Sequence, residues 1–180
     1  MSAMLEEHVF LIGMPGSGKS SLGKKAAANL QLPFVDMDAL IEEAVGLSIP
    51  DIFAVHGEQA FRNAETNTLI SLASREPSVV STGGGAVLSP ENRSLMRNQG
   101  VIVLIDRPLE QILSDIRLDR RPLLAKKGLE EVKRLYGERI DIYRSVCDLC
   151  VTNDASFYEG VRRLQDAVTS LAGADNSAAE

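Results

Sequence analysis

The residues best suited to chemistry form a glycine-rich segment near the amino terminus. Residues 13–20 read Gly-Met-Pro-Gly-Ser-Gly-Lys-Ser, which matches G-x-x-x-x-G-K-[ST] at every fixed position. Glycines let the backbone curl so that its N–H groups point at an anion, and a helix that starts there adds its positive end. The segment predicts a phosphate-binding loop (P-loop) that holds ATP through Gly16, Ser17, Gly18, Lys19, Ser20 and Ser21.

Two residues of this loop have roles beyond backbone binding. Lys19 is expected to reach the β- and γ-phosphates and is a candidate catalytic residue. The hydroxyl of Ser20 is expected to bind Mg²⁺, a hard cation that prefers oxygen ligands. The alternatives are a turn without a ligand and a dinucleotide-binding loop. The second is disfavoured because Gly16-Ser17-Gly18 is followed by Lys19, Ser20 and Ser21, so the third glycine of G-x-G-x-x-G is missing.

Two carboxylates follow the next apolar run, residues 32–35. They are Asp36 and Asp38, and the carboxyl ends of parallel strands carry ligand residues. We expect Asp36 to hold the water shell of Mg²⁺, and Asp38 to accept a hydrogen bond from the attacking hydroxyl and orient it or act as base. The alternative is a helix cap, since Asp38 precedes Ala39. The P-loop favours the functional reading, and the GTPase motifs Asn-Lys-x-Asp and Asp-x-x-Gly after a strand are missing.

The elements that would position these residues alternate along the chain. Short apolar runs predict strands at 9–12, 32–35, 79–80, 101–105 and 149–151, and helical patterns fill 19–30, 39–45, 109–118, 129–146 and 157–171. Another helical pattern runs over 49–55, is interrupted by Gly57 and resumes over 58–75, and the sequence at 89–91 predicts a further helix start. This order predicts a three-layer α/β fold, a parallel five-stranded sheet with helices on both faces. We expect one domain over residues 1–172, with a disordered tail at 173–180 and His8 in an amino-terminal tail.

Composition bounds the function classes. The 180 residues carry a formal net charge of −6, with 44% hydrophobic residues and no Trp, which argues against nucleic-acid or anionic-membrane binding. No apolar run is long enough for a membrane span, and the start does not look like a secretory signal. Cys147 and Cys150 are too few for a disulfide scaffold, and we expect them to be structural and half-buried. We expect a cytoplasmic monomer.

The chain resembles the shikimate kinase family from Val9 to about Leu171. The resemblance rests on motifs in the family's order: the P-loop, Asp36-Met37-Asp38, Gly57-Glu58-Gln59-Ala60-Phe61-Arg62, Ser81-Thr82-Gly83-Gly84-Gly85-Ala86, Arg121-Pro122-Leu123-Leu124, and Glu138-Arg139 to Tyr143. It implies a nucleoside-monophosphate-kinase-like P-loop fold. It also implies ATP and Mg²⁺, and phosphorylation of a ring hydroxyl (3-OH) of shikimate.

The resemblance also implies an acceptor site. Arg62 and Arg139 would clamp the shikimate carboxylate, since the planar guanidinium matches a carboxylate. Gly83, Gly84 and Gly85 would approach the acceptor closely, and Arg144 is a weaker candidate cation. Arg121 lies in a charged segment, about 117–128, that would form a lid, and it would contact ATP and reach the transferring phosphate. Glu65, three residues after Arg62, could orient that arginine.

One departure from the family concerns adenine. Many members carry an arginine before the lid and another after the last strand, where this chain has Ser114 and Ala155. Arg117 or Arg120 is a potential substitute, and 153–156 is the suggested edge of the adenine pocket. Two rival functions stay open: another small hydroxy-acid kinase such as a gluconate kinase, and a non-catalytic ATP-binding regulatory module.

Overall fold

The computed structural model describes residues 5–115 and 128–174. Its elements, in chain order, are β1 (His8–Ile12), α1 (Lys19–Leu30), β2 (Phe34–Asp36), α2 (Met37–Val45), α3 (Ile49–Leu72), β3 (Val79–Ser81), the 3₁₀ helix η1 (Ala86–Leu88), α4 (Pro90–Gln99), β4 (Gly100–Asp106), α5 (Leu109–Asp115), α7 (Gly128–Val146), β5 (Leu149–Thr152) and α8 (Phe157–Ala174). The predicted lid falls outside the described residues except for Gly128, the first residue of α7. The last six residues of the predicted tail also fall outside, and α8 includes its first two.

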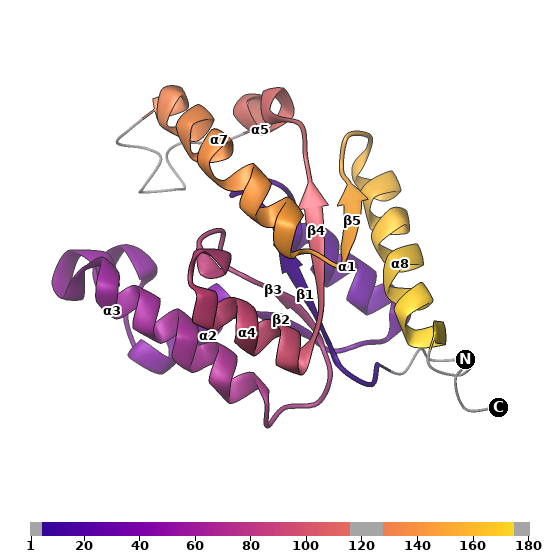
Figure 1. Ribbon diagram of the computed structural model, residues 1–180, viewed down its shortest axis with the longest axis horizontal. Coiled ribbons are helices and arrows are strands. Elements are labelled where there is room, and N and C mark those ends of the chain that lie inside the picture. The colour runs from indigo at the N-terminus through magenta and orange to yellow at the C-terminus, as the bar shows by residue number, and fades with distance from the viewer. Residues whose placement is uncertain (1–4, 116–127, 175–180) are drawn as a thin grey trace.

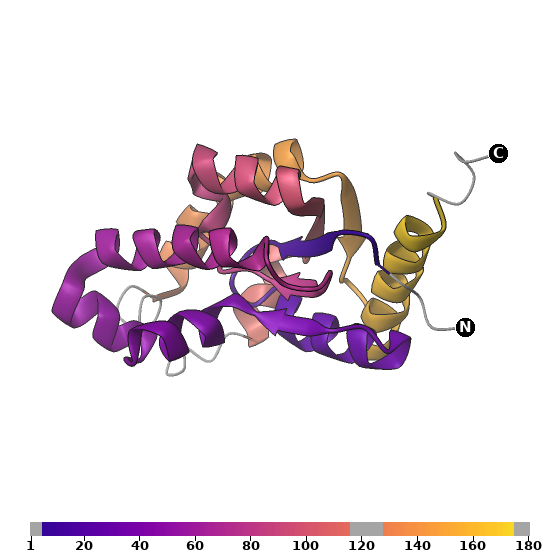
Figure 2. The same ribbon diagram turned by 90° about the horizontal axis from the view of Figure 1, so that it is seen from below.

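The five strands form one parallel sheet in the order β2-β3-β1-β4-β5. Parallel strands need crossover connections, and here helices supply them, so both faces of the sheet are covered. Figures 1 and 2 show this arrangement from two directions. The prediction of a five-stranded α/β sheet is confirmed. Within the described ranges no helix is long and apolar enough to cross a membrane.

Alternate residues of each buried strand face two different cores, because side chains alternate across a sheet. On one face, Phe10 and Ile12 of β1 pack with side chains of α2, α3, α4, α5 and α7. On the other face, Val9 and Leu11 pack with side chains of α1 and α8. The sheet is thereby fixed between two helical layers, and its carboxyl edge becomes a rigid platform for the loops that follow each strand.

Two local predictions need correction. His8 does not lie in a tail: it begins β1 and is buried, with Nε2 3.0 Å from the carbonyl oxygen of Leu72 and with Nδ1 accepting a 3.1 Å bond from the Ser78 N–H. The second strand covers residues 34–36 rather than 32–35, and α2 begins at Met37. The predicted interruption at Gly57 is confirmed, because this residue has φ 80° and ψ 174° inside α3.

Candidate active site

The P-loop connects β1 to α1 and curls as its glycines predict. Gly16 and Gly18 have positive φ values of 84° and 101°, which residues other than glycine rarely adopt. Gly18 is the N-cap of α1, and within the described residues no side chain caps the first amides of this helix. The positive end of α1 therefore faces the loop with its N–H groups directed at whatever the loop holds.

Lys19 is held over the loop by the loop's own backbone. Its ammonium donates to the carbonyl oxygens of Gly13 at 2.9 Å and Met14 at 3.0 Å, and the residue is only 8% exposed. A Cβ on Gly13 would lie 2.6 Å from the carbonyl oxygen of Ile105, so only glycine fits this approach of the loop to β4. The arrangement puts a cation beside the helix amides, as phosphate binding requires.

Two oxygen-bearing side chains lie beside the loop. The Ser20 hydroxyl lies 2.9 Å from the Ser81 hydroxyl at the end of β3. Asp36 ends β2, and its Oδ1 accepts the backbone N–H of Asp38 at 3.0 Å and of Ala39 at 3.4 Å. The helix cap considered for Asp38 is thus formed by Asp36, while Asp38 lies in the first turn of α2. Ser21 points back, and its hydroxyl donates to the Gly18 carbonyl at 3.2 Å.

The predicted acceptor side begins with Arg62 on α3. Its guanidinium donates to Glu65 Oε2 at 2.6 Å and to Glu58 Oε1 at 3.1 Å. These contacts lie one helical turn on either side of Arg62, at the spacings where helix side chains meet. The suggested orienting role of Glu65 agrees with this geometry. The two carboxylates fix the plane of the guanidinium and raise the pKa of Arg62 despite its partial burial.

Glu65 is the most buried carboxylate of this cluster, with only 1% exposure. Burial raises its pKa above the usual 4.5, and the nearby Asp38 acts in the same direction. The positive charges of Arg62 and Arg139 oppose the shift without cancelling it. Glu65 Oε1 makes no hydrogen bond within the described part of the chain. Asp38, Arg62 and Arg139 therefore all act on the charge of Glu65, the buried member of the cluster.

The glycine run after β3 lies between the P-loop and this charged cluster. A Cβ on Gly83 would lie 2.8 Å from Glu65 Oε1 and 3.3 Å from Asp38 Oδ1, and one on Gly85 would lie 2.5 Å from Arg62 Nη1. A Cβ on Gly84 would lie 2.9 Å from Pro15 Cδ in the P-loop. The run thus touches both halves of the site, and the absence of side chains permits this approach.

Helix α7 closes the cluster from the other side. Tyr143 is buried, and its hydroxyl donates a 2.5 Å hydrogen bond to the carbonyl oxygen of Gly84. Burial raises the pKa of Tyr143, and the nearby positive charges of Arg139 and Arg62 act against that rise. Arg144, the weaker candidate, pairs instead with Asp106 at 3.2 Å and is exposed.

The structure therefore brings most predicted site residues to one edge of the sheet. They lie at or beside the carboxyl ends of β1, β2 and β3, and they are the P-loop, Asp36, Asp38, Arg62, the three glycines and Arg139. Arg121 lies outside the described residues. Sequence reasoning did not anticipate the bond from Tyr143 to Gly84. A tyrosine one helical turn after Arg139 was the available signal, but nothing in the sequence told which loop its hydroxyl would reach.

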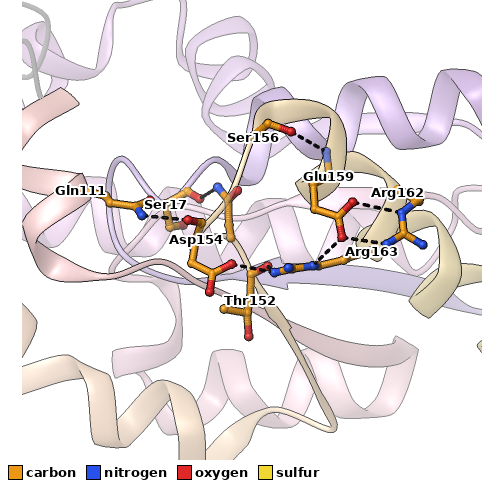
Figure 3. Close-up of polar contacts among 9 residues, drawn as sticks. Ser17, Gln111, Thr152, Asp154, Ser156, Glu159, Arg162 and Arg163 are labelled. Carbon is orange, nitrogen blue, oxygen red and sulfur yellow. Dashed lines mark hydrogen bonds and ion pairs between the residues drawn. The ribbon is translucent and has the colours of Figure 1, made fainter.

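The carboxyl ends of β4 and β5 meet the P-loop from the far side. Asn153 is buried, and its Nδ2 donates to the Ser17 carbonyl at 2.8 Å. Gln111 of α5 donates to the Asp154 carbonyl at 2.9 Å, and Arg163 of α8 donates to the Thr152 carbonyl at 2.9 Å (Figure 3). Asn153, suggested as part of the adenine edge, therefore turns its side chain toward the P-loop.

The cysteines do not form part of this site. Cys147 is half-buried, in agreement with the prediction, whereas Cys150 is exposed. Burial raises the pKa of both thiols, which disfavours the reactive thiolate. Within residues 5–115 and 128–174, no group of three or more His, Cys, Asp or Glu residues could hold a metal ion.

Comparisons with known proteins identify a family. A sequence model described as shikimate kinase matches residues 15–169. A shikimate kinase of Clostridium botulinum (strain Eklund 17B) is 41% identical over 164 residues, covering 91% of this chain and 98% of the relative. The structure of shikimate kinase from Acinetobacter baumannii in complex with shikimate superposes with a TM-score of 0.81 at 30% identity, covering 96% of this chain and 94% of that one.

A gluconokinase from Sinorhizobium meliloti has a similar fold, with a TM-score of 0.62 at 19% identity over 97% of this chain and 98% of that chain. At this identity the likeness concerns the fold alone, because P-loop kinases with different acceptors share one architecture.

Proposed function

Because this chain belongs to the shikimate kinase family, we propose that it transfers the γ-phosphate of ATP to the 3-hydroxyl of shikimate. The products would be shikimate 3-phosphate and ADP. The observation that carries the proposal is the glycine run of residues 83–85, which touches Pro15 of the P-loop on one side and Arg62 on the other. A phosphate in the loop and an acid gripped by Arg62 would then be neighbours.

ATP is the cosubstrate of this family, and the P-loop geometry suits its phosphates. No side chain caps the amides at the start of α1 within the described residues, and the Lys19 ammonium lies against the Gly13 and Met14 carbonyls of the same loop. The Ser17 hydroxyl is buried within the loop and makes no hydrogen bond within the described residues. Lys19 would stabilise the charge that develops on the β–γ bridge as it breaks.

The proposal also includes a Mg²⁺ ion bound beside the P-loop. Ser20 and Asp36 offer a hydroxyl and a carboxylate, both oxygen donors, and only Oδ1 of Asp36 is occupied by the helix cap. Mg²⁺ usually binds one or two protein oxygens together with substrate phosphates and water, so this small donor set fits it. When bound, the ion would neutralise phosphate charge. The two protein groups would fix its place beside the P-loop.

The acceptor half of the proposal rests on charge. Arg62 and Arg139 would hold the shikimate carboxylate, and the two carboxylates that contact Arg62 would keep its guanidinium in a fixed plane. Asp38 would accept a hydrogen bond from the 3-hydroxyl and orient its oxygen toward the γ-phosphorus. As the new O–P bond forms and the bond to the leaving ADP oxygen breaks, the hydroxyl proton would move toward Asp38.

Arg121 belongs to the proposal through the family resemblance alone. As a lid arginine, it would stabilise the negative charge on the transferring phosphoryl group, and a closed lid would exclude water from it. The expected cytoplasmic location and monomeric state also stay predictions.

An ADP-release assay tests the function. Purified protein with ATP and Mg²⁺ should release ADP rapidly with shikimate, and at a far lower rate with gluconate or without an acceptor. Faster turnover with gluconate would favour the sister kinase instead. ATP binding without ADP release for any acceptor would favour the regulatory module.

A further inference from the structure

One buried side chain at the end of β5 has no role in the site as described. Asn153 is only 8% exposed, and its backbone N–H donates to the Asp106 carbonyl at 2.7 Å. Its Nδ2 donates to the Ser17 carbonyl at 2.8 Å. The second bond joins residues 136 positions apart, so it ties the last loop of the sheet to the first.

The orientation of the Asn153 amide follows from its surroundings. The Ser17 carbonyl oxygen can only accept a hydrogen bond, so the nitrogen of the amide must face it. A Cβ on Gly18 would lie 2.9 Å from Nδ2, and one on Gly160 would lie 2.7 Å from Oδ1. Two glycines therefore leave just enough room for this side chain between the first turns of α1 and α8.

Peptide geometry gives the contact a consequence inside the loop. In a planar trans peptide, the C=O and the N–H point in opposite directions. The Ser17 carbonyl shares its peptide unit with the Gly18 N–H. Because Asn153 draws the carbonyl toward β5 and α8, the Gly18 N–H is turned the other way, into the phosphate-binding side of the loop.

The preceding peptide unit is held in the same manner. Arg107, which follows β4, donates from Nη1 to the Gly16 carbonyl at 3.1 Å, and its Nη2 is hydrogen-bonded to Asp115. The N–H of that peptide unit belongs to Ser17 and donates to the Met14 carbonyl at 3.0 Å. Two successive carbonyls of the P-loop are thus held from outside by side chains from the ends of β4 and β5.

We propose that Asn153, assisted by Arg107, is a positioning residue that holds the P-loop in its phosphate-binding conformation before the nucleotide arrives. This inference rests on the proposed use of ATP. A loop with three glycines in eight residues has much backbone freedom to lose on binding. If only a fraction of the molecules hold the loop in its binding conformation, the apparent affinity for phosphate is reduced by that fraction. Holding the loop in this conformation in advance therefore increases the measured affinity.

The test compares ligands that contain phosphates with ligands that do not. Binding of inorganic tripolyphosphate, ADP, adenosine and shikimate is measured by calorimetry, in the presence of Mg²⁺, for the wild type and for Asn153→Ala. We expect tripolyphosphate and ADP each to bind about tenfold more weakly to the variant, corresponding to about 1.4 kcal/mol. Adenosine and shikimate should bind as they do to the wild type.

A matched control comes from a neighbouring hydrogen bond to the loop that carries Asn153. Gln111→Ala removes the bond to the Asp154 carbonyl, next to Asn153, but does not reach the P-loop. Tripolyphosphate affinity should therefore be unchanged in this variant. Arg107→Lys keeps the positive charge but cannot form both bonds of the guanidinium, so it should weaken tripolyphosphate binding less than Asn153→Ala does. Arg107→Lys is also the variant to measure if Asn153→Ala fails to fold.

Three results would overturn the proposal. Weaker ADP binding with unchanged tripolyphosphate binding would place the effect of Asn153 at the adenosine end. Equal losses for shikimate and tripolyphosphate, together with a lower melting temperature, would mean a general folding role. Unchanged affinities would mean that the bond does not order the loop. If the wild type binds tripolyphosphate in an Asn153-dependent way yet never phosphorylates shikimate, the proposed function fails and this inference stands.

Discussion

The hydroxyl of Tyr143 donates a 2.5 Å hydrogen bond to the carbonyl oxygen of Gly84. This bond ties α7 to the glycine run that lies between Pro15 and Arg62. Because α7 also carries Arg139, the bond fixes the distance between two parts of the proposed acceptor site. Loss of this hydrogen bond should therefore weaken acceptor binding and also lower the stability of the fold.

Tyr143→Phe removes only this hydroxyl. The Gly84 carbonyl would lose its partner, so the free energy of unfolding should fall by about 1–3 kcal/mol. The KM for shikimate should rise several-fold, with little change in the KM for ATP. Tyr136→Phe is a matched control on the same helix, since the Tyr136 hydroxyl makes no hydrogen bond among the residues that the structure describes. Equal effects of the two substitutions would contradict this account.

Arg62→Lys keeps the positive charge and removes the planar guanidinium group. A lysine cannot bond a carboxylate through two parallel N–H groups, and a charge-assisted hydrogen bond contributes about 1.5–3 kcal/mol. Shikimate affinity should fall by about tenfold or more, while ATP affinity barely moves. Titration with each substrate separates the two effects. A similar loss for both substrates would mean that Arg62 supports the fold rather than the acceptor.

Gly85→Ala should disturb the same arginine without touching its charge. Gly85 has φ −97°, which alanine adopts freely, so backbone strain is not expected. The new Cβ would lie 2.5 Å from Arg62 Nη1 and would displace the guanidinium. Shikimate affinity should fall as in Arg62→Lys, with ATP affinity retained.

Gly137→Ala is the control for Gly85→Ala. A Cβ on Gly137 meets no atom within 4 Å, and alanine favours helix over glycine by about 0.5–1 kcal/mol. This variant should be slightly more stable than the wild type and equally active. A Gly85→Ala enzyme with unchanged shikimate affinity would show that Arg62 is not confined by the glycine run.

Glu65→Gln tests the buried carboxylate through pH. Because the folded-state pKa of Glu65 is raised above 4.5, the folded protein holds the proton more tightly than the unfolded chain does. The stability that this proton contributes is fully present below pH 4.5 and is lost as the pH rises through the raised pKa. Glutamine cannot lose a proton, so this part of the pH dependence disappears in the variant.

The measurement is chemical denaturation of both proteins between about pH 4 and 8. The stability of Glu65→Gln relative to the wild type should increase as the pH rises from 4.5, and then level off. Glu58→Gln, which loses an exposed contact with the same arginine, should change stability by less than about 1 kcal/mol. A constant difference between wild type and Glu65→Gln over this range would contradict the assigned pKa direction.

Local patterns predicted much of the fold because their physics is local. The P-loop motif, the apolar strands and the break at Gly57 each depend on a few neighbouring residues, and each appears in the structure. The topology then follows, since parallel strands joined by helices bring their carboxyl ends to one edge. The placement of Arg62 beside Glu65 also followed from helical spacing alone.

The errors occurred where a side chain finds its partner far along the chain. His8 bonds backbone groups of Leu72 and Ser78, and Asn153 bonds Ser17, so neither role is visible in the local sequence. A helix cap was only the alternative for Asp38, and Asp36 forms that cap because α2 begins at Met37, two residues before the predicted helix start at Ala39. The partners of such long-range hydrogen bonds can be identified only once the positions of the strands in the folded sheet are known.

The central claim is that one site at the carboxyl edge of the sheet joins the phosphates of ATP to a hydroxyl of shikimate. Its most direct test is to incubate the protein with ATP, Mg²⁺ and shikimate, and to quantify the products by phosphorus and proton nuclear magnetic resonance. ADP and shikimate 3-phosphate should form in equal amounts, and ADP should be released at a far lower rate when shikimate is withheld. ADP that accumulates at the same rate without shikimate, or without phosphorylated acceptor, would contradict it.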